Sequence, residues 1–418
     1  MSDAIDAKHT ILAGYAAQAD SSQLAIAIND YIYLSKDMGD CYMVLTDEGN
    51  VVVNTGFPET GLVHKARFNQ VSDKQIAFIV LTQCHANQFG GAMDMKGPNT
   101  QIIAQQRYPT CRHYWKILHQ FYARRSNKLW GDVLGKRSAV PAKLVEAELD
   151  ILFDDHYVFK LGGRRFELLA TPGGESLDSL VMWMPSERVL FTGNLFGPIF
   201  GHLPNLYTVR GDKIRSALEY IRSLQRVRNL QPEMILTGHG KPVVGADSIV
   251  EQIDRLQAAV QYIHDETVAG MNAGTDIYTL MAGIQLPERL ALGQGHGKVA
   301  WCVRAIWEEY AGWFHYDSTA SLYPSAPNSI ADDLVDLIGS VDVLAARAFS
   351  RIETGQPLHA VRLTDIALAA EPENRAALQA RLSAHELLLE QSGETFSEIM
   401  WLKSEIAKTR ETLLSITS

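Results

Sequence analysis

Cysteine is scarce in this sequence, and the few that occur lie far apart. They are Cys41, Cys84, Cys111 and Cys302, and none belongs to a CxxC pair. A disulfide framework or a structural zinc knot needs cysteines grouped at short intervals, so this spacing argues against both. We expect buried, reduced thiols, with Cys84 pointing into packing.

Long basic runs and long apolar runs are also missing. The 38 Lys and Arg are outnumbered by 48 Asp and Glu, which gives a net charge of −10. Such a balance disfavours nucleic acid and anionic membranes as partners. No stretch reaches the roughly 18 consecutive apolar residues of a spanning helix, and the first residues do not resemble a secretory signal. We expect a cytoplasmic protein that binds neither nucleic acid nor membrane.

The length of 418 residues and the apolar content of 46% predict two folded domains. In the first part of the chain, strand patterns alternate with helical ones at 59–71 and 212–229. The two strand-rich halves, with helices outside them, predict an α/β fold, a four-layer αββα sandwich. The strand patterns fall at residues 23–28, 31–35, 41–56, 76–82, 100–105, 157–174, 179–185, 188–194 and 233–240.

The pattern changes after Pro242, where amphipathic helical spacing begins and continues towards the C-terminus. We therefore predict a first domain at 1–245 and an all-helical domain at 246–418. The segment 106–150 is rich in aromatic and basic residues with helical spacing. We interpret it as a helical insertion, or lid, over a site in the first domain.

Four short motifs occur in a characteristic order. They are TQCHANQFGG at 82–91, TPGGE at 171–175, FTGN at 191–194 and TGHG at 237–240. The first resembles the T-H-x-H-x-D-H-x-G-G motif of the metallo-β-lactamase superfamily, and the others resemble that family's later metal-ligand loops. This resemblance implies the same sandwich fold and a site where the four loops meet.

Further segments narrow the resemblance to alkyl sulfatases. They are PNLYTVRG at 204–211, YIHDET at 262–267, VRA at 303–305 and GW at 312–313. The resemblance implies an alkyl sulfatase-like helical dimerisation domain, and hence a homodimer. It also implies that Glu175 matches a ligand position of that family. Arg210 lies where those enzymes use an arginine on the sulfate, with Tyr207 beside it.

Neutral amides stand at most of the ligand positions. Gln83, Asn87, Gln88 and Asn194 occupy places where the superfamily has histidines and aspartates. Two divalent ions about 4 Å apart repel each other by about 16 kcal/mol at an effective dielectric constant of 20, and bridging anions normally offset this. Because amides bring no charge, we predict that the chain does not hold a dizinc centre.

The ligand-type residues that remain are His85, Glu175 and His239. We predict that they act as acids and bases on a small organic, anionic substrate, by hydrolysis or elimination. The amides would then shape the pocket, with Tyr207 and Arg210 holding the anion.

Two alternatives stay open. In the first, the same three residues hold a single zinc or iron ion, or an iron-containing cofactor. In the second, the chain is a non-catalytic binding or scaffold homodimer. Convergence of the polar residues on one another would favour an enzyme over a scaffold.

Overall fold

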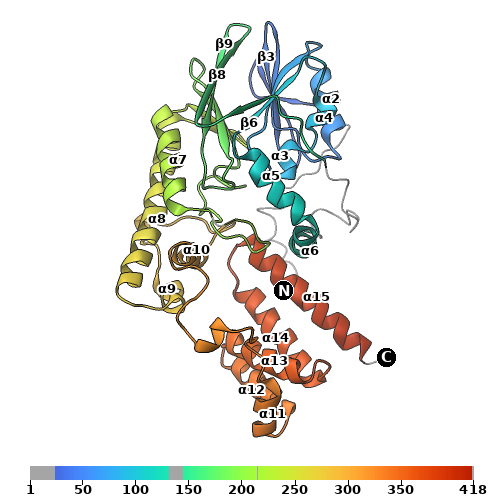
Figure 1. Ribbon diagram of the computed structural model, residues 1–418, viewed down its shortest axis with the longest axis vertical. Helices are drawn as coiled ribbons and strands as arrows, with labels where there is room; N and C mark the ends of the chain where they lie inside the picture. The colour runs from blue at the N-terminus through green and yellow to red at the C-terminus, as the bar shows by residue number, and fades with distance from the viewer. Residues whose placement is uncertain (1–23, 131–144, 214, 417–418) are drawn as a thin grey trace. The chain divides into compact units, whose positions relative to one another are not determined.

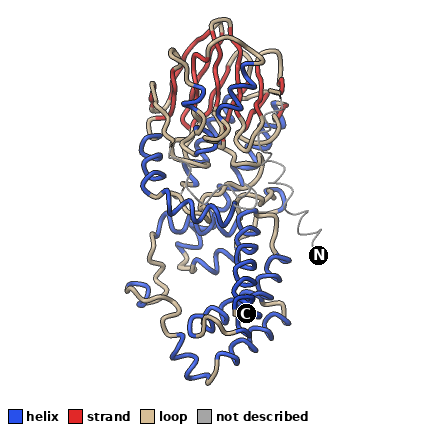
Figure 2. The backbone as a smooth tube through the Cα atoms, turned by 90° about the vertical axis from the view of Figure 1, so that its right-hand side faces the viewer, coloured by secondary structure: helices blue, strands red, loops and turns tan. Residues whose placement is uncertain are grey.

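The computed structural model describes residues 24–130, 145–213 and 215–416 (Figure 1). Its described residues form two compact units, the first from 24 to 310 without 127–130, and the second from 311 to 416 with 127–130. Figure 2 shows that the strands belong to the first unit and that the second is helical. No helix within the described ranges is long and apolar enough to cross a membrane.

The first sheet has seven strands that lie side by side in chain order. β1 to β4 form an antiparallel meander, and the predicted turn at 47–50 joins β3 to β4. β5, β6 and β7 continue the sheet in parallel, so helices must cross over between them. The strands are β1 (Ile26–Ala27), β2 (Ile32–Ser35), β3 (Cys41–Thr46), β4 (Gly49–Val53), β5 (Ile76–Val80), β6 (Gln101–Gln105) and β7 (Ile151–Phe153). The crossover helices are α2 (Gly61–Asn69), α3 (Ala86–Phe89), α4 (Ala92–Met95), α5 (Tyr108–Ile117) and α6 (His119–Trp130).

The second sheet has six strands in the order β13-β12-β11-β10-β9-β8. The pairs are antiparallel except β11 with β12, which are parallel and are connected through α7 (Ala217–Leu230). The strands are β8 (His156–Leu161), β9 (Arg164–Ala170), β10 (Leu180–Met184), β11 (Val189–Gly193), β12 (Met234–Thr237) and β13 (Val243–Val244).

The two sheets pack face to face around one apolar core. Ile32 and Val51 of the first sheet belong to the same buried cluster as Phe166, Met182 and Phe191 of the second. Strands of both sheets are buried on both faces, as in β4 and β10. A sheet buried on both faces needs a helical layer outside it.

Helices cover the outer faces of both sheets. Phe68 of α2 and Met95 of α4 pack with Ile79 beneath the first sheet. On the second sheet, Leu190 packs with Leu224 of α7. The predicted αββα sandwich is confirmed.

Three further helices also pack on this unit, although the sequence predicted that a second domain begins at residue 246. They are α8 (Ala246–Asn272), α9 (Ile277–Gly283) and α10 (Val299–Ala311). Ile253 of α8 and Val303 of α10 share a core with Trp183 of β10. By packing, the chain therefore divides near residue 310, while the predicted domain limits remain a prediction.

The second unit is built from short and medium helices connected by tight turns. Val341 and Leu344 pack with Ala367 and Ala377 in one of its small cores. The all-helical character predicted for the C-terminal part is confirmed. Its main helices are α11 (Ala331–Ile338), α12 (Val341–Glu353), α13 (Pro357–Ala370), α14 (Arg375–Gln391) and α15 (Phe396–Ser415).

One predicted boundary is wrong in a way that matters for the site. The helical pattern suggested a start at Asp212, but α7 begins at Ala217. The Ser216 hydroxyl accepts from the Glu219 backbone N–H and so caps the first turn. Asp212 is left in the preceding loop, where its carboxylate is free to reach His85.

Candidate functional site

His85 stands at the junction between β5 and α3. It is the residue before the first turn of α3 and has an extended backbone (φ −75°, ψ 140°). The Gln83 amide donates to His85 Nδ1 at 2.7 Å, while the Ser179 hydroxyl donates to the Gln83 oxygen at 3.5 Å. With Nδ1 acting as acceptor, the ring proton belongs on Nε2, which lies 3.5 Å from Asp212 Oδ2.

Glu175 comes from the loop after β9 and lies on the other side of the ring. Its Oε2 is 4.0 Å from His85 Nδ1, and its Oε1 accepts from His296 Nε2 at 2.7 Å. Burial opposes the negative charge, but Arg215, followed by His296, outweighs it and holds the pKa of Glu175 well below its usual value. Glu175 is therefore an anion at neutral pH and is not a proton donor in this state.

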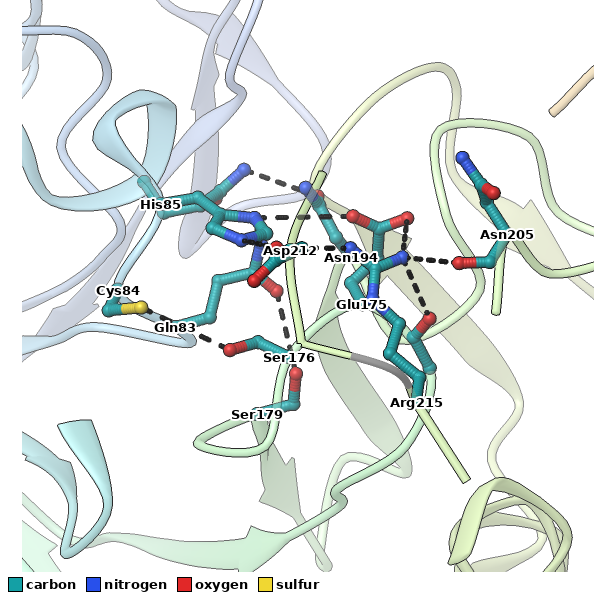
Figure 3. A network of polar contacts seen from close by, with 12 residues as sticks. Gln83, Cys84, His85, Glu175, Ser176, Ser179, Asn194, Asn205, Asp212 and Arg215 are labelled. Atoms are coloured by element: carbon teal, nitrogen blue, oxygen red, sulfur yellow. Dashed lines mark hydrogen bonds and ion pairs between the residues drawn. The ribbon is translucent and has the colours of Figure 1, made fainter. Parts of the chain in front are cut away.

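Arg215 links the two carboxylates (Figure 3). Its Nη1 lies 3.3 Å from Glu175 Oε1 and its Nη2 lies 3.6 Å from Asp212 Oδ2. Nη1 also donates to the Asn205 carbonyl at 2.6 Å, and the side chain is 2% exposed. Burial opposes the charge of Asp212 as well, yet His85 and Arg215 hold its pKa well below the usual range. A permanent positive charge thus occupies the centre of the site.

Three of the four amides at the ligand positions, Gln83, Gln88 and Asn194, hydrogen-bond to other side chains. Gln88 donates to the Asn194 carbonyl oxygen at 3.2 Å, just as Gln83 donates to His85. Gly193 sets this geometry, because it has a φ of +50° and a Cβ there would lie 2.2 Å from the Thr82 hydroxyl. Asn87 is half-buried, and no hydrogen bond of its side chain occurs within the described residues.

His239 lies apart from this network, on the loop after β12. It lines an open cavity together with Lys36 and Lys241. Burial, and then Lys36, lower the pKa of His239 to about 4, although Glu175 acts in the opposite direction. The imidazole is therefore neutral at pH 7.

These residues do not fit the two-zinc centre of the fold. Gln88 and Asn194 are neutral and hydrogen-bond to each other, and the guanidinium of Arg215 brings its own charge to the carboxylates. Within the described residues, the only three ligand-type side chains whose donor atoms all lie within 4.8 Å of one another are Cys84, Cys111 and Asp178. The set His85, Glu175 and His239 is therefore not at mutual ligand distance.

Tyr207 and Arg210, the two residues predicted to bind the anion, have different partners in the structure. The Arg210 guanidinium lies 3.7 Å from Asp212 and stacks 4.8 Å above the Trp115 ring. Tyr207 instead has its hydroxyl beside Glu308, and burial and Glu308 raise its pKa. Arg210 thus belongs to the network around His85, whereas Tyr207 interacts with Glu308.

Helix α5, which lies within the segment predicted to be a lid, places Trp115 against His85. The Trp115 ring meets the His85 ring edge to face, with centroids 5.3 Å apart. The cavity beneath has a volume of about 10 Å³, enough for about one water molecule. Residues 131–144 of the predicted lid lie outside the described part of the chain. The cavity is lined by Cys111, Tyr114, Trp115, Glu175, Ser176, Leu177, Asp212, Lys213 and Arg215.

Sequence reasoning missed Asp212 and Arg215 and did not assign His296. Asp212 directly follows the matched PNLYTVRG segment, and that position was the available signal. Arg215 and His296 gave no comparable signal, because their roles depend on loops that meet only after folding.

Comparisons with known proteins identify the families that the two parts of the chain resemble. Residues 34–239 match the metallo-beta-lactamase superfamily, and residues 278–407 match the alkyl sulfatase dimerisation family. The chain joins a metallo-β-lactamase domain to an alkyl sulfatase dimerisation domain. The predicted family is confirmed.

Several relatives of low sequence identity are named as alkylsulfatases or alkyl/aryl-sulfatases. A linear primary-alkylsulfatase of Pseudomonas sp. is 28% identical over 361 residues, which cover 80% of this chain and 67% of the relative. An alkyl/aryl-sulfatase of Saccharomyces cerevisiae is 24% identical over 404 residues, covering 89% of this chain and 62% of that relative. The chain thus spans about two thirds or less of their lengths.

A solved structure extends the match to nearly the whole chain. The stereoselective inverting sec-alkylsulfatase of Pseudomonas sp. superposes with a TM-score of 0.83 at 19% identity. The match covers 96% of this chain and 70% of that protein. At this identity, the likeness establishes the fold of the metallo-β-lactamase and helical parts together.

Proposed function

We propose that the chain is a hydrolase of the alkylsulfatase-like metallo-β-lactamase fold that acts on a small anionic ester without a dizinc centre. The observation that carries the proposal is the Asp212–His85 pair, 3.5 Å apart, beside the buried Arg215. A carboxylate that orients an imidazole is the usual arrangement of a general base. Relatives named as alkylsulfatases make sulfate esters the first substrates to test.

In the proposed reaction, a water molecule replaces the Gln83 amide as the donor to His85 Nδ1. His85 takes one proton from this water, the oxygen attacks the ester, and the leaving oxygen departs with the bonding electrons. Asp212 stabilises the imidazolium, which returns its proton to the departing oxygen. Arg210 is proposed to bind the anionic group, with Arg215 holding both carboxylates in position, and His239 is proposed to contact the substrate from the neighbouring cavity.

The test is hydrolysis of a panel of small alkyl and aryl sulfates by the full chain. His85→Ala should lower kcat/KM by about 10² to 10⁴, the usual contribution of a general base. His156→Ala is the matched control, because His156 lies on the surface, where it pairs with Glu167. Equal activity of the wild type and His85→Ala would reject the proposed base.

A non-catalytic scaffold dimer is the second candidate, and the small cavity under α5 favours it. Alkyl sulfatase dimerisation families pair two chains, so a homodimer is proposed under either function. Measuring both binding and turnover of the same anions distinguishes the hydrolase from the scaffold. A scaffold would bind without turnover, and its binding would not change when Asp212 is replaced by Asn.

A further inference from the structure

Two buried thiols and one buried carboxylate meet beside the His85 site. The Sγ atoms of Cys84 and Cys111 and a carboxylate oxygen of Asp178 all lie within 4.8 Å of one another. These side chains belong to residues that are 1%, 8% and 0% exposed, respectively. None of the three stands at a ligand position of the metallo-β-lactamase motifs.

The buried carboxylate of Asp178 is only partly hydrogen-bonded. Among the described residues, Asp178 Oδ1 accepts from the Ser176 hydroxyl and Asp178 Oδ2 has no hydrogen-bond partner, while the Cys84 thiol interacts with the carboxylate. The buried hydroxyl of Tyr108 also lacks a hydrogen-bond partner in the described part of the chain, and it interacts electrostatically with Cys84 and Asp178. An unpaired buried carboxylate oxygen costs free energy unless an ion or a water satisfies it.

The spacing suits a tetrahedral ion. Zinc–sulfur bonds of about 2.3 Å place two tetrahedral sulfur ligands about 3.8 Å apart, so shifts of about 1 Å are enough to close the site. Thiolates combined with a carboxylate form a ligand set that favours zinc over magnesium or calcium. Three protein ligands leave the fourth position for water or the Ser176 hydroxyl, which lies 4.0 Å from Cys84 Sγ.

We propose that Cys84, Cys111 and Asp178 form a mononuclear zinc site. Binding releases one proton from each thiol, and the sulfur electron pairs form the two metal–sulfur bonds. The ion joins three separate segments: the loop after β5, helix α5 and the loop before β10. Because α5 carries Trp115 over His85, the site holds the covering helix in place.

The proposal is independent of the proposed hydrolase activity, because its test measures metal. The reduced, untagged full chain is stripped with a chelator and titrated with cobalt(II) chloride, and zinc then competes for the site. We expect one ion per chain and the near-ultraviolet absorption of a cobalt–thiolate bond. Zinc should also raise the unfolding temperature, since it binds only the folded chain.

Variants separate this site from the His85 network. Cys111→Ser and Asp178→Asn should each weaken zinc binding at least about 100-fold, because removing a direct ligand costs more than disturbing its surroundings. Cys302→Ser is the matched control, since Cys302 is buried elsewhere, next to the Pro204 carbonyl. His85→Ala should retain the ion. Circular dichroism shows which variants are folded, and metal binding is compared only among those.

Several results would overturn the proposal, and three of them come from the metal titrations. They are an absence of cobalt–thiolate absorption in the folded, reduced wild type, equal zinc affinity of Cys111→Ser and Cys302→Ser, or loss of the ion in folded His85→Ala. A Cys84–Cys111 disulfide that persists in the presence of reductant would also overturn it, because it would leave no thiolate to bind metal.

Discussion

His85 Nε2 lies 3.5 Å from the Asp212 carboxylate, and this contact joins two loops that are far apart in the sequence. The other ring nitrogen accepts from Gln83 at 2.7 Å. Together the two partners select one tautomer, with the proton on Nε2. The structure therefore has an oriented imidazole whose accepting nitrogen is covered by the Gln83 amide.

Asp212→Asn should lower kcat/KM for the cleaved ester by at least about 100-fold, because the neutral amide brings no negative charge to stabilise an imidazolium at His85. The pH profile of kcat should change as well. Asp254→Asn, at a surface acid that pairs with Arg228, is the control. A variant with an unchanged rate and profile would remove Asp212 from the mechanism.

Arg215→Met should destabilise the fold by about 3 to 5 kcal/mol, because it leaves Glu175 and Asp212 buried without their cation. The measurement is the free energy of unfolding in urea at pH 7. Arg228→Met breaks an exposed ion pair, which solvent screens, and should cost far less than Arg215→Met. Similar losses in both variants would contradict a buried, paired role for Arg215.

Stability should depend on pH through Asp40. Burial raises the pKa of Asp40 to about 7, although Lys36 lies 2.9 Å away and acts in the opposite direction. Between about pH 4 and pH 7 the folded chain holds a proton that the unfolded chain has released. This contribution to stability is present below about pH 4 and is lost as the pH rises through about 7.

Asp40→Asn should therefore flatten the decline of the urea midpoint between pH 5 and pH 8. The exposed Asp47 provides the control, and Asp47→Asn should keep the wild-type slope. If Asp40→Asn shows the same slope as the wild type, Asp40 is already charged across this range.

His239→Ala should lower activity while leaving the fold intact, since His239 lies on a loop at the rim of an open cavity. The pKa of His239, lowered to about 4, means that its imidazole stays neutral from pH 5 upwards. The rate should consequently show no His239 ionisation in that range. Full activity in His239→Ala would confine the active site to the His85 network.

The chain should have the mass of a dimer in light scattering at micromolar concentration. Large apolar side chains are exposed on the second unit, among them Trp313 at 73%, Tyr316 at 89% and Leu337 at 84%. A contiguous exposed apolar patch marks an interaction surface, and we expect Leu337 to belong to one. Leu337→Asp should then shift the mass towards one chain, whereas Leu62→Asp, on the first unit, should not. A wild-type monomer would contradict the proposed homodimer.

The sequence alone was sufficient for the architecture. Strand periodicity, the 47–50 turn and the order of the four motifs predicted both sheets and the family, because these signals are local and each strand buries its own apolar face. The short edge strands β7 and β13 were not predicted, because two or three residues are too few to show the alternation of apolar and polar side chains that marks a strand. The predicted start of α7 was wrong because the helical pattern extends upstream of Ser216, the residue that caps the helix.

The contents of the site were decided by tertiary structure. The sequence pointed to His85 and Glu175 through the motifs, and these two do approach each other at 4.0 Å. It could not show that Arg215 would lie between Glu175 and Asp212, or that Cys111 would reach Cys84 from a helix further along the chain. Spacing along a chain predicts which face of one element a residue occupies. Which loops meet at the edge of the sandwich depends on how the two sheets pack, and local sequence patterns do not predict this packing.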